Sequence, residues 1–163
     1  MEIYLLRHGE AEESLRIPDA ERSLTSAGRR KLGDVLLRAR QGGAAPALIL
    51  SSPLRRAMET AELAAGILGT RESVQKSNAL IPEAAPAEVW GEIRVHRDAE
   101  RLLLTGHEPL LSQAAAYLIG APSAQIEMRK GSLARIDVDP FSPEPRGVLL
   151  WLLTAELSAG DAT

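Results

Sequence analysis

The stretch Ile3-Tyr4-Leu5-Leu6-Arg7-His8-Gly9-Glu10 decides the fold, because a short apolar run stops abruptly at a polar cluster. An apolar run this short, with no alternating polar residues, is typical of a strand buried on both faces of a parallel sheet. Two other runs have the same form, residues 47–50 before Ser51-Ser52-Pro53 and residues 102–104 before Thr105-Gly106-His107. The sequence therefore predicts three buried strands, each followed by a polar cluster.

Each predicted strand is followed by apolar residues at helical spacing, in residues 32–39, 54–68 and 110–118. Thr25 is expected to start the first helix. Ser52 and Pro53 are expected to provide the N-cap and the first position of the second helix, and the third is expected to begin near Pro109. Strand and helix in alternation are typical of an α/β layered fold.

The last third of the chain has a different pattern. Residues 133–138 and 148–153 are predicted strands joined by a proline-rich turn, which favours a hairpin or an extension of the sheet at its edge. Upstream, Val74 is expected to open a short strand, and a weak helix is expected after Pro86. Because no repeat or linker interrupts the chain, the sequence predicts one domain over residues 1–157 and a frayed tail at residues 158–163.

Composition restricts the class of protein. The 163 residues are 45% hydrophobic and 25% charged, as in an ordinary soluble domain. The net charge of -3 argues against a nucleic-acid binder, and no apolar run approaches the roughly twenty residues of a membrane span. The N-terminus lacks the basic region of a signal peptide, so a cytoplasmic location is expected. The absence of cysteine excludes disulfides and thiolate chemistry.

The polar clusters after the strands are expected to form one site. Ligands of open α/β sheets bind outside the carboxyl ends of the strands, and the predicted helices begin there with their partial positive charge. The side chains expected at this edge are Arg7, His8, Arg56 and His107, with the backbone of Gly9 beside them. A cationic pocket of this kind favours a phosphoryl group. No nucleotide-binding glycine motif is present.

These residue types indicate phosphoryl transfer with histidine as nucleophile. His8 is expected to attack phosphorus, while Arg7, Arg56 and a protonated His107 stabilise charge on the transferring group. Because the two histidines would need opposite protonation states, a bell-shaped pH dependence is expected. A leaving group needs a proton, for which Glu83 and Glu10 are the candidate donors, and spacing does not choose between them.

Less specific interpretations apply to several of these groups. Two histidines raise the question of a metal, but a clear third ligand is missing and the arginines repel cations, so no metal and no cofactor are expected. An exposed loop carboxylate accounts for Glu83 as well as a proton donor does. His96 lies in a charged stretch and is expected on a solvated face.

Three motifs resemble those of the histidine phosphatase superfamily. Arg7-His8-Gly9 is similar to its RHG signature, and residues 51–61 resemble its SxLxRAxxTA stretch, whose arginine falls on Arg56 with Arg55 as a solvated neighbour. Gly106-His107 matches its second-histidine motif. RHG alone is weak, but three matches in the right order are specific.

Four longer stretches resemble the short, SixA-type phosphohistidine phosphatases of that superfamily. They are residues 7–11, residues 22–28 with Arg22, residues 80–83 with Glu83, and residues 106–110. The resemblance covers residues 1 to about 153 and implies a phosphoglycerate-mutase-like, three-layer α/β/α sandwich with a mostly parallel central sheet. It also implies that His8 is phosphorylated, that Arg7, Arg56 and His107 cradle the phosphate, and that Arg22 lies at the rim, where a plain surface charge remains the alternative.

The resemblance implies hydrolysis of phosphohistidine on a protein through a phosphohistidine intermediate on His8. The chain departs from the superfamily in lacking a clear copy of the acid motif after the second helix, and Glu83 occupies the corresponding stretch. A weak acid position favours phosphohistidine, because its imidazole can take a proton from solvent and an alkoxide needs a donor. The alternatives are a phosphomonoesterase or mutase-like enzyme for a small metabolite, and a non-catalytic phosphate-binding module. The sequence carries no signal for an oligomeric state.

Overall fold

A computed structural model describes residues 1–160 of the chain. The strands are β1 Glu2–Arg7, β2 Leu48–Ser51, β3 Gln75–Lys76, β4 Arg101–Gly106, β5 Leu133–Asp137 and β6 Val148–Leu153. The helices are α1 Ser26–Gln41, α2 Arg55–Leu68, α3 Pro86–Val95, α4 Leu110–Leu118 and α5 Ala155–Ser158, with short 3-10 turns η1 Asp19–Glu21 and η2 Asn78–Leu80.

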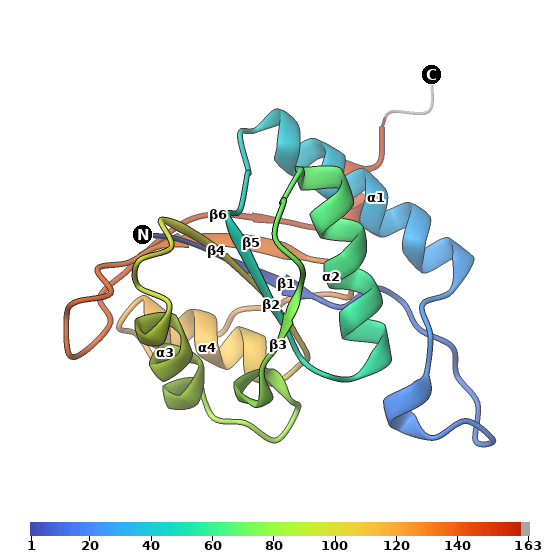
Figure 1. Cartoon of the computed structure of the whole chain (residues 1–163), viewed down its shortest axis with the longest axis horizontal. Coiled ribbons are helices and arrows are strands. Elements are labelled where there is room, and N and C mark those ends of the chain that lie inside the picture. Colours follow the sequence, from blue (N-terminus) through green and yellow to red (C-terminus); the bar gives the residue numbers. More distant parts are fainter. Residues whose placement is uncertain (161–163) are drawn as a thin grey trace.

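The six strands form one sheet in the order β3-β2-β4-β1-β5-β6 (Figure 1). Strands β3, β2, β4 and β1 pair in parallel, and β5 pairs antiparallel with both β1 and β6. Only β5 runs against the other strands, so the predicted mostly parallel sheet is confirmed. The predicted hairpin at the sheet edge is confirmed as β5 and β6.

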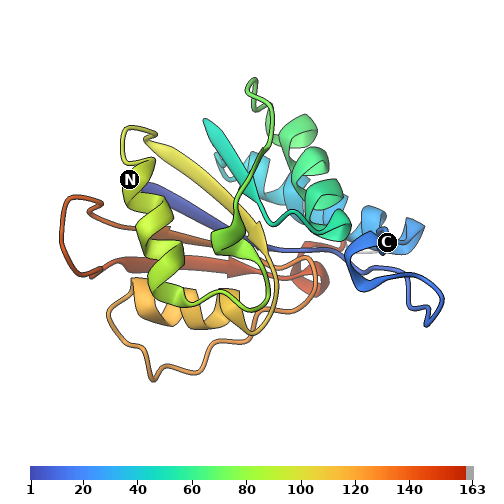
Figure 2. The same ribbon diagram turned by 60° about the horizontal axis from the view of Figure 1, so that its bottom comes forward.

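Helices cover both faces of the sheet, because successive residues of a buried strand point to opposite sides. Ile3 and Leu5 pack in a core with α3 and α4, whereas Tyr4 and Leu6 pack in a second core with α1 and α2. Figure 2 shows the two helical layers on either side of the strands. The predicted three-layer α/β/α sandwich is therefore confirmed.

Two local predictions need correction. Helix α2 begins at Arg55 with Leu54 as its N-cap, so Ser52 does not cap it. The reason is that the Ser52 N–H still donates to the Thr105 carbonyl at 2.9 Å, as part of the sheet. Ser158, predicted as the first residue of the tail, is instead the buried last residue of α5.

Two other local predictions are confirmed. The short strand near Val74 is confirmed as β3, and the helix after Pro86 as α3. Residues 161–163 of the predicted tail lie outside the described residues. No helix within residues 1–160 combines the length and the apolar character needed to cross a bilayer.

The loop after β1 is held against the start of α1. The Thr25 N–H donates to the Glu10 carbonyl at 2.9 Å, and the Thr25 hydroxyl accepts from Gly28 N–H and caps the helix. A Cβ on Gly28 would lie 2.3 Å from the Glu10 carbonyl oxygen, which no real contact permits. A glycine at position 28 therefore lets the segment that follows His8 lie against α1.

We expect Gly28→Ala to destabilise the fold by about 1–3 kcal/mol, because the added methyl pushes the loop away from α1. Gly33→Ala is the matched control, since Gly33 lies in the same helix with nothing within 4 Å of an added Cβ. That control should be stabilised by about 0.5–1 kcal/mol. Urea denaturation of both variants measures the difference, and equal midpoints would contradict the close contact.

Candidate active site

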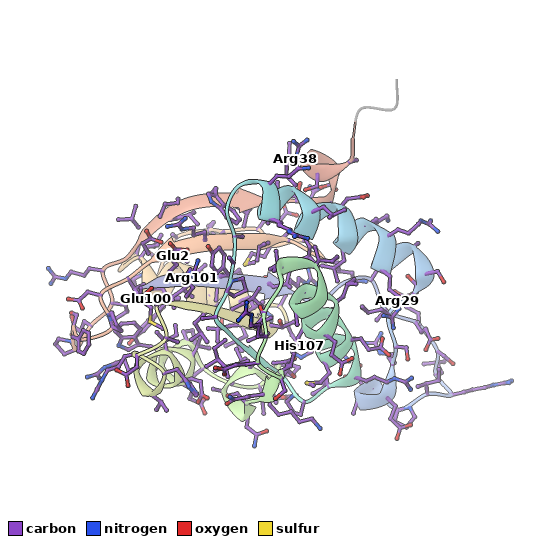
Figure 3. The ribbon with its side chains drawn as sticks, turned by 45° about the horizontal axis from the view of Figure 1, so that its top comes forward. Glu2, Arg29, Arg38, Glu100, Arg101 and His107 are labelled. Carbon is purple, nitrogen blue, oxygen red and sulfur yellow. The ribbon has the colours of Figure 1, made fainter. Side chains whose placement is uncertain are left out.

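The register of the parallel strands brings the polar clusters together. Arg7 at the end of β1 lies opposite Gly106 at the end of β4, and the His8 N–H donates to the Gly106 carbonyl at 3.0 Å. The rings of His8 and His107 consequently lie with their centroids 5.1 Å apart. Figure 3 shows His107 beside α2, away from Glu2 and Arg101 at the opposite end of the sheet.

His8 is buried, with 7% of its surface exposed, and its hydrogen bonds determine which ring nitrogen is free to react. Nδ1 lies 2.7 Å from the Gly9 carbonyl oxygen, and because a carbonyl only accepts, Nδ1 carries the proton. Nε2 therefore has the lone pair, which accepts a hydrogen bond from Arg56 Nε at 3.4 Å. This neutral tautomer is the one that can attack phosphorus through Nε2.

Arg56 lies at His8, and Arg55 does not. Arg56 is 5% exposed and comes from the first turn of α2. Arg55 is exposed and pairs with Glu59 at 3.1 Å. Of the two adjacent arginines, the one favoured by the motif register is thus the one at the site.

Thr60 joins the loop that follows His8 to α2, the helix that carries Arg56. Its buried hydroxyl accepts from the Gly9 N–H at 3.1 Å and donates to the Arg56 carbonyl at 2.7 Å. In the sequence, Thr60 is part of the SxLxRAxxTA stretch, but that motif assigns it no role. In the structure it couples the backbone beside His8 to α2.

Asp19 is a site residue that the sequence reasoning missed. Its carbonyl accepts from Arg56 Nη1 at 2.8 Å and its carboxylate from Arg56 Nη2 at 3.2 Å. The same carboxylate accepts from Nε and Nη2 of Arg22, so Arg22 reaches the site only through Asp19. No local pattern marks this aspartate, since it opens the short 3-10 turn η1 and its partner is 37 residues away.

Charge keeps the Asp19 carboxylate ionised. Burial raises the pKa of Asp19, but hydrogen bonds and charge from Arg22 and Arg56 outweigh burial and lower the pKa overall. The Asp19 side chain is 63% exposed and that of Arg56 is 6% exposed, so the ion pair joins an exposed carboxylate to a buried guanidinium. A hollow of about 570 Å³ lies next to it, lined by Glu13, Ser14, Leu15, Ile17, Asp19 and Arg22.

Arg7 lies at the strand end beside His8 and is anchored to the loop before β5. Its Nη1 donates to the Met128 carbonyl at 2.8 Å. Its Nε is buried and has no hydrogen-bond partner among residues 1–160. Burial lowers the pKa of this guanidinium, and Glu108 opposes that effect.

The two candidate proton donors are not held at the histidines. Glu83 is exposed in the turn after η2, and among residues 1–160 it has no hydrogen bond to a side chain of the site. The Leu80 carbonyl packs against Gly106, which brings that segment to the end of β4. Glu10 pairs with Lys31 at 3.1 Å. The proton-donor role of Glu83 stays a prediction.

His107 is 2% exposed, and its ring bonds to Ser52, the predicted N-cap of the second helix. Its Nε2 lies 2.8 Å from Ser52 Oγ, and its Nδ1 is buried without a hydrogen-bond partner among residues 1–160. Sequence reasoning placed Ser52 at the correct strand end but in the wrong role.

Both histidines are neutral in the free protein. Burial lowers the pKa of His8 to about 4, opposed by the Gly9 hydrogen bond and assisted by Arg56, Arg7 and Lys130. Burial also lowers the pKa of His107 to about 3, with further lowering by His8 and Arg56. The expectation of a protonated His107 is therefore wrong for the free protein, because the surrounding cations and burial both disfavour a second positive charge.

The arrangement has the chemistry of an anion site that holds two neutral imidazoles. Two guanidinium groups and two imidazoles lie around one point at the sheet edge, and they suit a tetrahedral oxyanion. Within residues 1–160, no group of three or more His, Cys, Asp or Glu side chains is arranged to hold a metal ion.

Comparison with known proteins identifies the family of the chain. A family model described as the histidine phosphatase superfamily (branch 1) matches residues 3–81, which include Arg7, His8, Gly9 and Arg56. An uncharacterised protein from Picosynechococcus is 33% identical over 136 residues, which cover 82% of each chain.

Solved structures share the fold. The protein histidine phosphatase SixA, complexed with tungstate, superposes with a TM-score of 0.85 at 22% identity, covering 95% of this chain and 97% of that one. A mycobacterial glucosyl-3-phosphoglycerate phosphatase with inorganic phosphate gives a TM-score of 0.68 at 18% identity, covering 95% and 98%. The sequence matches and the phosphoglycerate-mutase-like fold agree, and the chain belongs to the histidine phosphatase superfamily.

Proposed function

We propose that this protein hydrolyses phosphohistidine on a protein substrate, with His8 as the covalent nucleophile. The observation that carries the proposal is the state of His8, whose Nδ1 proton is held by the Gly9 carbonyl while Nε2 is left with its lone pair beside Arg56. The proposal is supported by the similarity of the fold to that of the protein histidine phosphatase SixA.

In the first step, the Nε2 lone pair of His8 forms a bond to phosphorus and the phosphorus–nitrogen bond of the substrate breaks. The departing imidazole takes a proton from solvent at its other nitrogen and leaves neutral. Water then attacks the phosphorus on His8, loses a proton to solvent, and releases inorganic phosphate with His8 restored. Arg7, Arg56 and His107 stabilise the charge on the phosphoryl oxygens.

The carboxylates near the site support a phosphohistidine substrate over an alkyl phosphate. Asp19 is the carboxylate that contacts Arg56, and its lowered pKa keeps it ionised at neutral pH, so it holds no proton for a leaving alkoxide. Glu83 is exposed and makes no side-chain bond to the histidines or Arg56 among residues 1–160. An imidazole leaving group has less need of such a donor.

A metabolite phosphatase is the second candidate, because a glucosyl-3-phosphoglycerate phosphatase shares the fold. The deciding experiment compares turnover of a phosphohistidine-bearing phosphocarrier protein with that of a phosphoserine peptide and a panel of sugar and glycerate phosphates. We expect the phosphocarrier to be hydrolysed with the highest kcat/KM. A metabolite phosphate turned over faster than the phosphocarrier would overturn the proposal.

Replacement of His8 by alanine should abolish turnover and acid-labile labelling of the protein, because no other side chain would form the bond to phosphorus. The control is His96→Ala, since His96 pairs with Glu92 on α3 and is not part of the site. Both variants are labelled with a phosphohistidine substrate and quenched in alkaline detergent, and half of each sample is then acidified to show whether the label is acid-labile. Label that persists in His8→Ala would show that the nucleophile is another residue.

Replacement of Arg56 by alanine should lower kcat by about a hundredfold to a thousandfold, the usual loss for a preplaced donor to a developing oxyanion. Arg55→Ala removes the same charge one position earlier and should leave kcat within about threefold, because Arg55 makes only an exposed ion pair. Steady-state kinetics on both variants tests the assignment. A larger loss of kcat in Arg55→Ala than in Arg56→Ala would show that Arg55 is the arginine that acts on the phosphoryl group.

Formation of the phosphoenzyme should be retained as the pH falls from about 8 to about 5, because His8 must be unprotonated and burial holds its pKa at about 4. Below that value Nε2 takes a proton and the rate should decline. Rapid-quench labelling over this pH range, corrected for ionisation of the substrate itself, gives the profile. An acid limb centred near the ordinary histidine value of about 6.5 would contradict a buried neutral nucleophile.

A further inference from the structure

Ser52 and His107 form a buried pair at the ends of β2 and β4. Ser52 has no exposed surface and His107 is 2% exposed, and Ser52 Oγ lies 2.8 Å from His107 Nε2. The backbone holds the pair in place, because the Ser52 N–H donates to the carbonyl of Thr105, two residues before His107. This contact forms part of the site, yet neither the motifs nor the mechanism above give it a role.

The hydrogen atoms of this pair can be assigned by counting donors. Ser52 Oγ accepts from the Leu54 N–H at 3.4 Å, so one of its lone pairs is engaged. Its own proton has His107 Nε2 as the acceptor within reach among the described residues. A neutral imidazole that accepts at Nε2 must carry its proton at Nδ1.

The neutral state of His107 follows first from its burial and then from the charges around it. The groups that act on its ring are His8, Arg56 and Arg7, which disfavour a positive charge, and Asp19, which favours one. Burial adds to the first group and the pKa of His107 falls to about 3. His107 is thus uncharged in the free protein at neutral pH, so the ring that phosphate first meets is neutral.

We propose that Ser52 is a positioning residue, which holds His107 in the Nδ1–H tautomer so that a neutral imidazole donates a hydrogen bond to the phosphoryl group. Nδ1 is the buried nitrogen that has no partner among residues 1–160, and it belongs to the ring that faces His8 at 5.1 Å. The inference rests on the proposed function in taking phosphate as the ligand of this site.

The two histidines then work in complementary tautomers. His8 donates its Nδ1 proton to the Gly9 carbonyl and presents a lone pair, whereas His107 accepts from Ser52 and presents a proton. One ring can attack phosphorus while the other binds a phosphoryl oxygen, and neither has to be charged. This arrangement removes the need for the opposite protonation states that the sequence suggested.

The tautomer is measured directly by nitrogen NMR on the wild-type protein with labelled histidine. The chain has three histidines, so the ring signals can be assigned with His96→Gln and His8→Ala variants. We expect His107 to show a protonated Nδ1 and an unprotonated Nε2 at neutral pH. A protonated Nε2 on His107 would mean that the ring donates to Ser52, and the proposal would be overturned without any variant of Ser52.

The role of the hydroxyl is tested with Ser52→Ala and its neighbour Ser51→Ala as control. Both serines are fully buried, but Ser51 Oγ donates to the Ser52 carbonyl and does not contact His107. In Ser52→Ala, the Nε2–H form of His107 should appear and the affinity for inorganic phosphate should fall about tenfold to a hundredfold. Ser51→Ala should keep the wild-type tautomer and bind phosphate within about threefold.

These readouts separate this inference from the proposed function. If phosphohistidine is not turned over but His107 is Nδ1-protonated and phosphate affinity depends on Ser52, the substrate assignment fails and the role of Ser52 stands. If phosphohistidine is turned over but Ser52→Ala leaves both the tautomer and phosphate affinity unchanged, the role of Ser52 fails alone.

Discussion

In the parallel register of β1 and β4, Arg7 lies opposite Gly106, so the residues that follow, His8 and His107, leave the sheet side by side. The His8 N–H bond to the Gly106 carbonyl extends that pairing by one residue. Because parallel strands carry their carboxyl ends to one edge, the two imidazoles meet although 99 positions separate their backbones in the chain. A shift of one residue in this register would turn one ring to the other face.

Burial then decides the chemistry of the two rings. A histidine on the surface is half protonated near pH of about 6.5, but His8 and His107 are buried and feel the charges of Arg56 and Arg7. Low polarity and like charge both favour the neutral ring. In the proposed reaction, His8 is thereby unprotonated and able to attack at neutral pH, and the positive charge for a phosphoryl group comes from the guanidinium groups of Arg7 and Arg56.

The loop that follows His8 is held from two sides. Gly28 lets the Glu10 backbone approach α1, and Thr60 bonds at once to the Gly9 N–H and to the carbonyl of Arg56. Glu59, one position earlier on α2, accepts from the Leu24 N–H and pairs with Arg29 of α1. The elements that carry the nucleophile and its arginine are consequently fixed to one another, as a preorganised site requires.

Local pattern in the sequence was sufficient to predict the strands, the covering helices and the edge of the sheet at which Arg7, His8, Arg56 and His107 lie. Burial on a sheet and helical periodicity leave a trace in neighbouring positions. Pattern could not reveal that Ser52 bonds to His107 and caps no helix, or that Asp19 reaches Arg56 from the short 3-10 turn η1. It also led to a charged His107, since protonation depends on burial and on cations brought from other strands. Such properties arise from contacts between residues distant along the chain, and only the folded arrangement of those residues decides them.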